Sequence, residues 1–432
     1  MKNKFLYKGV AVALATSALV AVLSGCGEKK LPDRVDKAND LLASVQKSDT
    51  APVYDFKAET EKPESYDNYI NKNGALALDL LRGEAFATKN TAVAPVGVTL
   101  SLSALENGAS GETLKQVKKV LGKSTYSTEI INESASYLTQ RMSFFNTEEL
   151  GIYNVNSIWV TNTNSPKRGF LQKYDNYYNI FAYKADFTDA KTPTLISNLI
   201  KDNSMELIPT NGVAVKSDYK LYLDSSAVVS DSWLYGYEEA DVSTGKFTAS
   251  DGKAVDASYI TSVERSFSVQ HAKGFVKDLK NTPCKLLCVM PDKDVTLEKY
   301  VSDLTTENLL DLARSASPTS FTTVSMPEFS VSNSTSIKDT LISMGVKDIF
   351  TSNADFSKAF AEDIFVDDYT QNVTITVNKN GISTDIVQEE VAKNNQKTKA
   401  TLKLDRPFLY AVIDNESNAP IIIGTVNNPN SK

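Results

Sequence analysis

Residues 405–410 read DRPFLY, and residues 424–429, close to the end of the chain, read GTVNNP. They belong to two apolar runs, 408–413 and 421–426, which are separated by the polar stretch DNESN at 414–418. Asp and Asn favour turns because their short side chains hydrogen-bond the neighbouring backbone. This part of the chain is therefore predicted to form a β-hairpin, and it is the most distinctive segment of the sequence.

Upstream of the hairpin, apolar patterns predict both helices and strands. A helix is expected over 99–106, where three leucines occur and Gly108 follows as a stop signal. A second helix is expected after the N-cap candidate Ser110, with one apolar face. Five more apolar runs are predicted as strands, at 153–160, 221–229, 284–290, 322–331 and 373–377. Interleaved helices and strands indicate a mixed α+β domain. Because no linker or repeat interrupts residues 66–432, we expect them to form one domain.

The first 25 residues have the pattern of a lipoprotein signal peptide. Three lysines within the first eight residues precede an apolar run at 9–23, which is short for a membrane span. The run ends in Leu-Ser-Gly before Cys26, so we expect cleavage there and a lipid on Cys26. The lipid would anchor the protein to the cell membrane on its extracytoplasmic side. The alternative is a plain secretory signal with an incidental cysteine. Residues 26–65 are predicted to be the lipidated N-terminus and a polar tether.

Composition narrows the classes of function. A formal net charge of -7 argues against nucleic acid as a partner, since phosphate binding needs clustered Lys and Arg. Cys284 and Cys288 lie four positions apart on a predicted strand, which separates them by about 13 Å. That distance is too long for a disulfide. We therefore expect both to be small core residues rather than metal ligands. The single histidine, His271, is expected at the surface. No catalytic motif accompanies it, so we expect no enzyme, cofactor or metal site.

Five motifs in order resemble the serpin family over almost the whole length from residue 66 to residue 430. The first two are the segments 90–98 with 105–113 and the Asn-x-x-Trp-Val strand at 156–160. The third is a strand and helix between 329 and 350, with Phe329, Leu341, Met344-Gly345-Val346 and Ile349-Phe350. The last two are the ADFS turn at 354–357 and the hairpin at 405–429. The resemblance implies a fold of about three β-sheets and eight or nine α-helices with an exposed reactive loop. It also implies that a target protease cuts this loop, becomes covalently attached, and is disabled when the loop inserts into a sheet as a new strand.

The reactive loop must lie between the predicted strand at 373–377 and Pro407. The hinge of the loop matches four residues, Gly381, Ile382, Ser383 and Thr384. A glycine suits this place because the chain must turn there with unusual dihedral angles. The scissile bond is expected in a window of six residues: Lys393, Asn394, Asn395, Gln396, Lys397 and Thr398.

Two counts place the bond within that window. Counting forward from Gly381 gives Asn395-Gln396, and counting back from Pro407 gives Gln396-Lys397. A lysine at the cut, Lys393 or Lys397, would suit a trypsin-like protease, and Asn395 would suit an asparagine-directed one.

The hinge departs from the alanine-rich pattern that inhibitory serpins usually have. Ile382, Thr384 and Ile386 would share one face of an inserted strand, as burial requires. Gln388 and Glu390 fall on the same face, where an unpaired polar group costs about 1–3 kcal/mol and a charge costs more. The sequence predicts that insertion begins readily and that its second half is opposed.

A second departure concerns the region where the central sheet of a serpin opens. The family commonly has two serines, an asparagine and a histidine there, whereas this chain has Ala94, Gly97, Ser225 and Gln371. Trp233 does match the family's tryptophan at the top of the sheet. We interpret the substitutions as an apolar repacking of this region.

Two functions from different classes are consistent with these residues. The first is a surface-anchored suicide inhibitor of serine or cysteine proteases, with an extracellular serine protease as the expected partner and the membrane as a second partner through Cys26. The alternative is a non-inhibitory binding or structural module whose loop is only a protease substrate or a recognition site. In both cases we expect a monomer.

Overall fold

The structure is a computed structural model. It describes residues 36–49, 51–56, 62–122, 124–147, 149–210, 213–316, 318–383, 394, 396 and 398–431, and all of these belong to one compact unit. The predicted signal peptide at 1–25 and the lipid site Cys26 lie outside the described residues.

The α+β class is confirmed by the order of the elements. The α-helices are α1 (Tyr66–Asn71), α2 (Asn73–Gly83), α3 (Pro95–Glu106), α4 (Gly111–Val120), α5 (Thr128–Phe144), α6 (Arg168–Tyr177), α7 (Thr192–Asn203), α8 (Leu297–Asp303), α9 (Thr306–Arg314) and α10 (Lys338–Ser343). Only Lys72 separates α1 from α2. The two form one interrupted helix, and counted in this way the described helices agree with the eight or nine expected.

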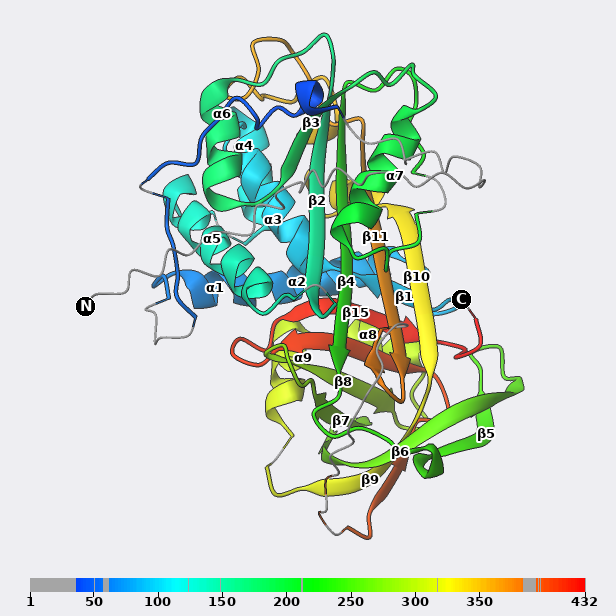
Figure 1. Ribbon diagram of the computed structural model, residues 1–432. Helices are drawn as coiled ribbons and strands as arrows, with labels where there is room; N and C mark the ends of the chain where they lie inside the picture. The colour runs from blue at the N-terminus through cyan, green and yellow to red at the C-terminus, as the bar shows by residue number, and fades with distance from the viewer. Residues whose placement is uncertain are drawn as a thin grey trace, which may run out of the picture. The chain divides into compact units, whose positions relative to one another are not determined.

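One sheet, which we call sheet A, contains the candidate site. Its strands lie in the order β10 (Phe329–Ser336), β11 (Asp368–Asn378), β12 (Gly381–Ile382), β4 (Leu221–Ser232), β2 (Gly151–Thr161) and β3 (Phe181–Ala185). Strands β4 and β11 run side by side in the same direction, as Figure 1 shows. They pair directly over seven residues each. At their C-terminal ends the two-residue strand β12 lies between them.

The second sheet, sheet B, includes the predicted C-terminal hairpin. Its order is β1 (Thr91–Val93), β15 (Pro420–Val426), β14 (Phe408–Asp414), β8 (Cys284–Pro291), β7 (Ala272–Asp278), β6 (Ala254–Val269), β9 (Phe321–Pro327) and β13 (Thr401–Lys403), and β5 (Val242–Thr248) pairs with β6. The first part of β6 pairs with β5 and β9, and its last five residues pair with β7. Strand β6 therefore joins what would otherwise be two sheets, which accounts for the third sheet expected.

The predicted strand 322–331 is in fact two strands, β9 and β10, which belong to different sheets. Pro327 ends β9, and the chain crosses to sheet A at Glu328, whose backbone N–H donates to Ser258 O. A proline cannot donate to a strand ladder, so the crossing occurs where one backbone donor is already missing.

The two faces of β4 are buried against different elements. Leu223, Ala227 and Val229 lie in the main core, which also contains the wholly buried helix α3. Tyr222 and Val228 lie in a second cluster with side chains of α7, and Figure 1 shows α7 across this face of the sheet. Because both faces are covered, every residue of β4 is buried, the polar ones included.

Part of the range predicted as a polar tether, 26–65, is packed against the domain. Leu41 N donates to Ala182 O of β3, at 2.9 Å, and Tyr54 stacks edge-on against Tyr137 of α5. Gln140 of α5 accepts from Tyr54 N and donates to Pro52 O. The described residues 36–49 and 51–56 are therefore part of the folded unit. Their apolar side chains are scattered along the sequence, so no pattern predicted that they pack against the core.

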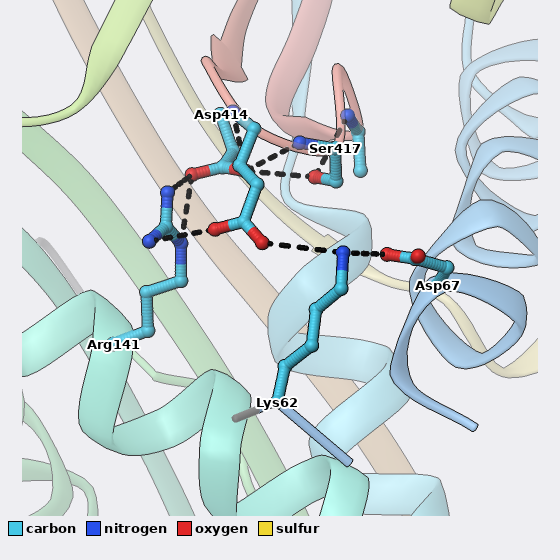
Figure 2. Close-up of polar contacts among 7 residues, drawn as sticks. Lys62, Asp67, Arg141, Asp414 and Ser417 are labelled. Atoms are coloured by element: carbon cyan, nitrogen blue, oxygen red, sulfur yellow. Dashed lines mark hydrogen bonds and ion pairs between the residues drawn. The ribbon is translucent and has the colours of Figure 1, made fainter. Parts of the chain in front are cut away.

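A network of charged residues fixes the turn of the C-terminal hairpin (Figure 2). Arg141 of α5 contacts Asp414 Oδ1 at 2.7 Å and Glu416 Oε2 at 2.9 Å, and Lys62 links Glu416 to Asp67. The second carboxylate oxygen of Asp414 accepts hydrogen bonds from Ser417. The turn that the Asp and Asn residues predict is confirmed, and helix α5 holds it in place.

Candidate functional site

The hinge begins inside sheet A. Gly381 pairs with Ser232 of β4 and Asn378 of β11, and Ile382 pairs with Asp231 and Val377. Ile382 is fully buried in the main core. Thr384, the fourth predicted hinge residue, lies outside the described residues. The first two residues of the hinge are therefore already a strand between β4 and β11.

The requirement for glycine at 381 has a different cause from the one predicted. The φ angle of Gly381 is not in the left-handed region. Instead, a Cβ atom at this position would lie 2.1 Å from the carbonyl oxygen of Asp231, which is fixed backbone. Only glycine lets β12 approach β4 this closely.

Asn378, which the sequence analysis did not single out, organises the turn from β11 into the hinge. Its Oδ1 accepts from Asn380 N at 2.8 Å and from Gly381 N at 3.3 Å, and its Nδ2 donates to Ser383 O at 2.8 Å. Its carbonyl accepts from the indole of the fully buried Trp233 at 2.9 Å. The signal was present in the sequence, because Asn two residues before Asn-Gly is typical of a turn in which the side chain bonds the following backbone.

The far end of the loop is attached to sheet B. Asn394 Nδ2 donates to Val263 O of β6 at 3.0 Å, and Thr398 Oγ1 donates to Phe321 O of β9 at 2.7 Å. Three residues of the predicted window are described, Asn394, Gln396 and Thr398. The other three, Lys393, Asn395 and Lys397, lie outside the described residues, so the scissile bond stays a prediction.

The structure brings the predicted sheet-opening residues together. Gln371 of β11 makes two hydrogen bonds to the backbone of Ala94, one accepted and one donated, both at 3.0 Å. Ser225 of β4 lies opposite Gln371, and Gly97 of α3 lies directly under Ser225, where a Cβ would come 2.2 Å from the serine oxygen. These four positions therefore form one contact region between α3 and sheet A.

The apolar repacking that we expected for this region is wrong. Within the described part of the chain, the buried side-chain oxygens Asn154 Oδ1 and Asn156 Oδ1 have no hydrogen-bond partner, and the hydroxyls of Ser225 and Tyr369 are buried in the same region. Burial raises the pKa of Tyr369, and the nearby hydroxyls of Ser101 and Ser225 partly offset this. Polar side chains of β2, β4 and β11 line this region, so the contact between α3 and sheet A is polar.

Sheet A also contains a buried carboxylate that the sequence analysis missed. Asp224 of β4 is fully buried, and its two oxygens accept from Ser226 Oγ and from Asn372 Nδ2 of β11, both at 2.7 Å. Asn372 Nδ2 also lies 3.1 Å from Ser226 Oγ. We call these three residues the seam cluster, because they join β4 to β11 where the two strands pair directly.

Burial raises the pKa of Asp224 to about 7, and the hydrogen bonds from Ser226 and Asn372 oppose that rise. The value in an unfolded chain is about 3.9. The carboxyl group of Asp224 holds its proton more tightly in the native state than in the unfolded chain, so protonation favours the native state. This stabilisation is fully present below about pH 4 and is lost as the pH rises through about 7. The seam cluster therefore changes its charge close to neutral pH.

The other residues that the sequence analysis considered are not part of this site. His271 is exposed in the turn between β6 and β7. Cys284 and Cys288 are buried, unbonded thiols in β8, as predicted. No group of three or more metal-binding side chains occurs in the described ranges. None of the described helices combines the length and apolar character needed to cross a membrane.

Comparison with known families finds a match to the family described as Serpin (serine protease inhibitor) over residues 71–429. Among curated relatives, heparin cofactor 2 of Oryctolagus cuniculus is 24% identical over 378 residues, which cover 84% of this chain and 77% of the relative. An uncharacterized serpin-like protein of Methanosarcina acetivorans is 21% identical over 438 residues, 97% of this chain and 98% of the relative.

Solved structures agree with this match. The thermophilic serpin tengpin in its native state superposes with a TM-score of 0.80 at 27% identity, over 90% of this chain and 99% of tengpin. Tengpin in its latent state gives a TM-score of 0.72. Human thyroxine-binding globulin complexed with thyroxine, at 17% identity, gives 0.77 and supports the fold alone.

Proposed function

Because this chain belongs to the serpin family, we propose that it is a suicide inhibitor of an extracellular serine protease, acting through cleavage between Lys393 and Thr398 and insertion of the segment that runs from Ser383 to the cut. One observation carries the proposal. Gly381 and Ile382 already pair with both β4 and β11, so the loop enters the sheet in the register that a full inserted strand would continue. An inhibitor needs this starting point, whereas a loop that is only a recognition site does not.

The type of protease follows from the window. Lys393 and Lys397 would direct a trypsin-like protease, and Asn395 would direct an asparagine-specific one, so cysteine proteases of that specificity belong in the test. We propose that the inhibitor acts as a monomer.

Mixing the protein with a panel of serine and cysteine proteases should yield, for at least one of them, a complex that survives boiling in SDS. The covalent bond forms only with an active nucleophile, so the same protease with its catalytic residue blocked is the control. Mass spectrometry of the released C-terminal fragment should place the cut between Lys393 and Thr398. Cleavage within that window without any complex, across the whole panel, would favour the non-inhibitory alternative.

We also propose that the protein is anchored at the extracytoplasmic face of the cell membrane by a lipid on Cys26. The Leu-Ser-Gly-Cys pattern at 23–26 supports this. Changing Cys26→Ala should move the protein from the membrane and detergent phase to the aqueous phase. The matched variant Cys284→Ala, which removes a buried thiol, should stay with the membrane. Equal partitioning of the Cys26→Ala variant and the parent would contradict the anchor.

A further inference from the structure

A cavity of about 460 Å³ lies away from sheet A, between α8, α9 and the turn from β6 to β7. Figure 1 shows α8 and α9 beside sheet B. Only Leu304 and Thr305 separate the two helices, and the extended backbone of Leu304 turns the chain between them. Gln270 and His271, the two residues of the β6–β7 turn, close the cavity on its other side. Its volume is within the range of about 300–1,000 Å³ that is typical of sites for small organic molecules.

The walls of this cavity are held in place by the protein itself. The side-chain oxygens of Thr296 and Thr305 cap the first turns of α8 and α9. The carbonyl oxygen of His271 accepts from Asp292 N at 2.8 Å, which ties the β6–β7 turn to the loop before α8. The φ angle of His271 is 63°, a left-handed conformation that residues other than glycine rarely adopt. A ligand would therefore meet preformed walls, which lowers the entropy cost of binding.

The inner wall is apolar and contains one unused hydroxyl. Four aliphatic side chains line it: Val269, Val295, Leu304 and Leu312. Tyr300 of α8 lines it too and is 8% exposed. Burial alone raises the pKa of Tyr300 to about 12, and no described residue forms a hydrogen bond with its hydroxyl. The phenol therefore stays protonated, and a ligand that bonds it would satisfy a polar group that the protein leaves unpaired.

The rim of the cavity is acidic. The carboxylates of Asp303 and Asp311 line it, whereas no lysine or arginine does among the residues that the structure describes. Lys299 contacts both oxygens of Asp303, and Arg314 contacts Asp311 through Oδ1 at 2.8 Å. Both ion pairs are more than half exposed, and such pairs contribute little. The second oxygen of Asp311 is therefore able to accept a hydrogen bond from another cation.

We propose that this cavity binds a small primary amine with an aromatic or aliphatic body. The ammonium group would contact Asp311, the body would lie against the apolar wall, and Tyr300 would supply a further hydrogen bond. An anionic ligand would be repelled by both aspartates, and a neutral ligand would gain nothing from them. The inference does not depend on the inhibitory function, because the described lining of the cavity includes no residue of sheet A or of the hinge.

His271 allows a direct test, because it is the single histidine of the chain and lines the cavity. Its imidazole gives one unambiguous NMR signal. Titration of the full chain in detergent with phenethylamine at neutral pH should shift that signal until it saturates. Phenethyl alcohol, which has the same shape without the charge, should bind about fivefold more weakly. Hydrocinnamate, the corresponding carboxylate, should bind more weakly still.

Variants of the cavity separate the contributions. Asp311→Asn should weaken the binding of phenethylamine about fivefold and leave that of phenethyl alcohol unchanged. Tyr300→Phe should weaken the binding of both by about threefold or more. Asp256→Asn is the matched control, because Asp256 is an exposed carboxylate paired with Lys246 outside the cavity, and this variant should bind as the parent does. Absence of a saturable shift with phenethylamine, equal affinity for the amine and the carboxylate, or full affinity for the amine in Asp311→Asn would overturn the inference.

Discussion

A single cut between Lys393 and Thr398 should raise the melting temperature of the protein by tens of degrees. The freed segment can continue β12 between β4 and β11, which pairs its backbone groups and buries alternate side chains. Ile386 would join Ile382 on the core face, and full burial of an isoleucine contributes about 1.5–3 kcal/mol. Calorimetry of intact and cut protein at pH 6 measures the difference.

The polar residues of the loop are less of an obstacle than their sequence pattern indicates. In the register of β12, Gln388 would lie opposite Ser225 and Gln371, and Glu390 would lie opposite Leu223 and Tyr369. The hydroxyls of Ser225 and Tyr369 are buried at these positions, close to each other. An inserted Gln388 or Glu390 would therefore meet polar hydroxyl groups with which it can form hydrogen bonds, and insertion need not stall halfway.

Gly381→Ala is the decisive variant for this prediction. Its methyl group would lie 2.1 Å from Asp231 O, so β12 cannot stay in the sheet and the cut form should show little or no rise in melting temperature. Gly169→Ala is the matched control, because a Cβ there meets nothing within 4 Å on the exposed surface of α6. It should behave as the parent does. An unchanged melting temperature after cutting the parent would remove the inhibitory function.

The fold could be predicted because its signals are local or ordered along the chain. The hairpin at 408–426 was predicted from two apolar runs and a turn rich in Asp and Asn, and β14 and β15 confirm it. The break of 322–331 into two strands could not be predicted, because only the tertiary structure shows that β9 and β10 belong to different sheets. The packing of Tyr54 against Tyr137 was hidden for the same reason.

The site could be predicted only where a motif marks it. Gly381 and Trp233 were found by their place in a known pattern, although the reason for the glycine, its approach to Asp231 O, required coordinates. Asp224 and Asn372 were missed because nothing in a sequence distinguishes a buried carboxylate from an exposed one. Polar residues on a strand covered on both faces acquire their chemistry from burial, and burial is a property of the fold.

Replacing Lys277 with methionine should cost about 3–5 kcal/mol of stability, the largest effect that we expect from a single substitution away from the loop. The Lys277 ammonium group donates to Glu264 Oε1 and to Tyr235 O, and the side chains of this ion pair are only 1% and 7% exposed. It also lies over the rings of Tyr237 and Trp233, at 4.5 and 5.2 Å from their centroids.

Methionine fills the same space as the lysine stem but leaves the Glu264 carboxylate buried, with a hydrogen bond from Ser262 Oγ. Urea unfolding of parent and variant measures the loss. Arg265→Met is the matched control, because Arg265 follows Glu264 and pairs with Asp278, which follows Lys277. Both side chains of this ion pair are about 30% exposed, so the pair should contribute no more than about 1 kcal/mol. Adding Glu264→Gln to Lys277→Met should recover part of the loss, since the amide has no charge to bury. Equal losses for Lys277→Met and Arg265→Met would show that the buried pair is not a major source of stability beneath Trp233.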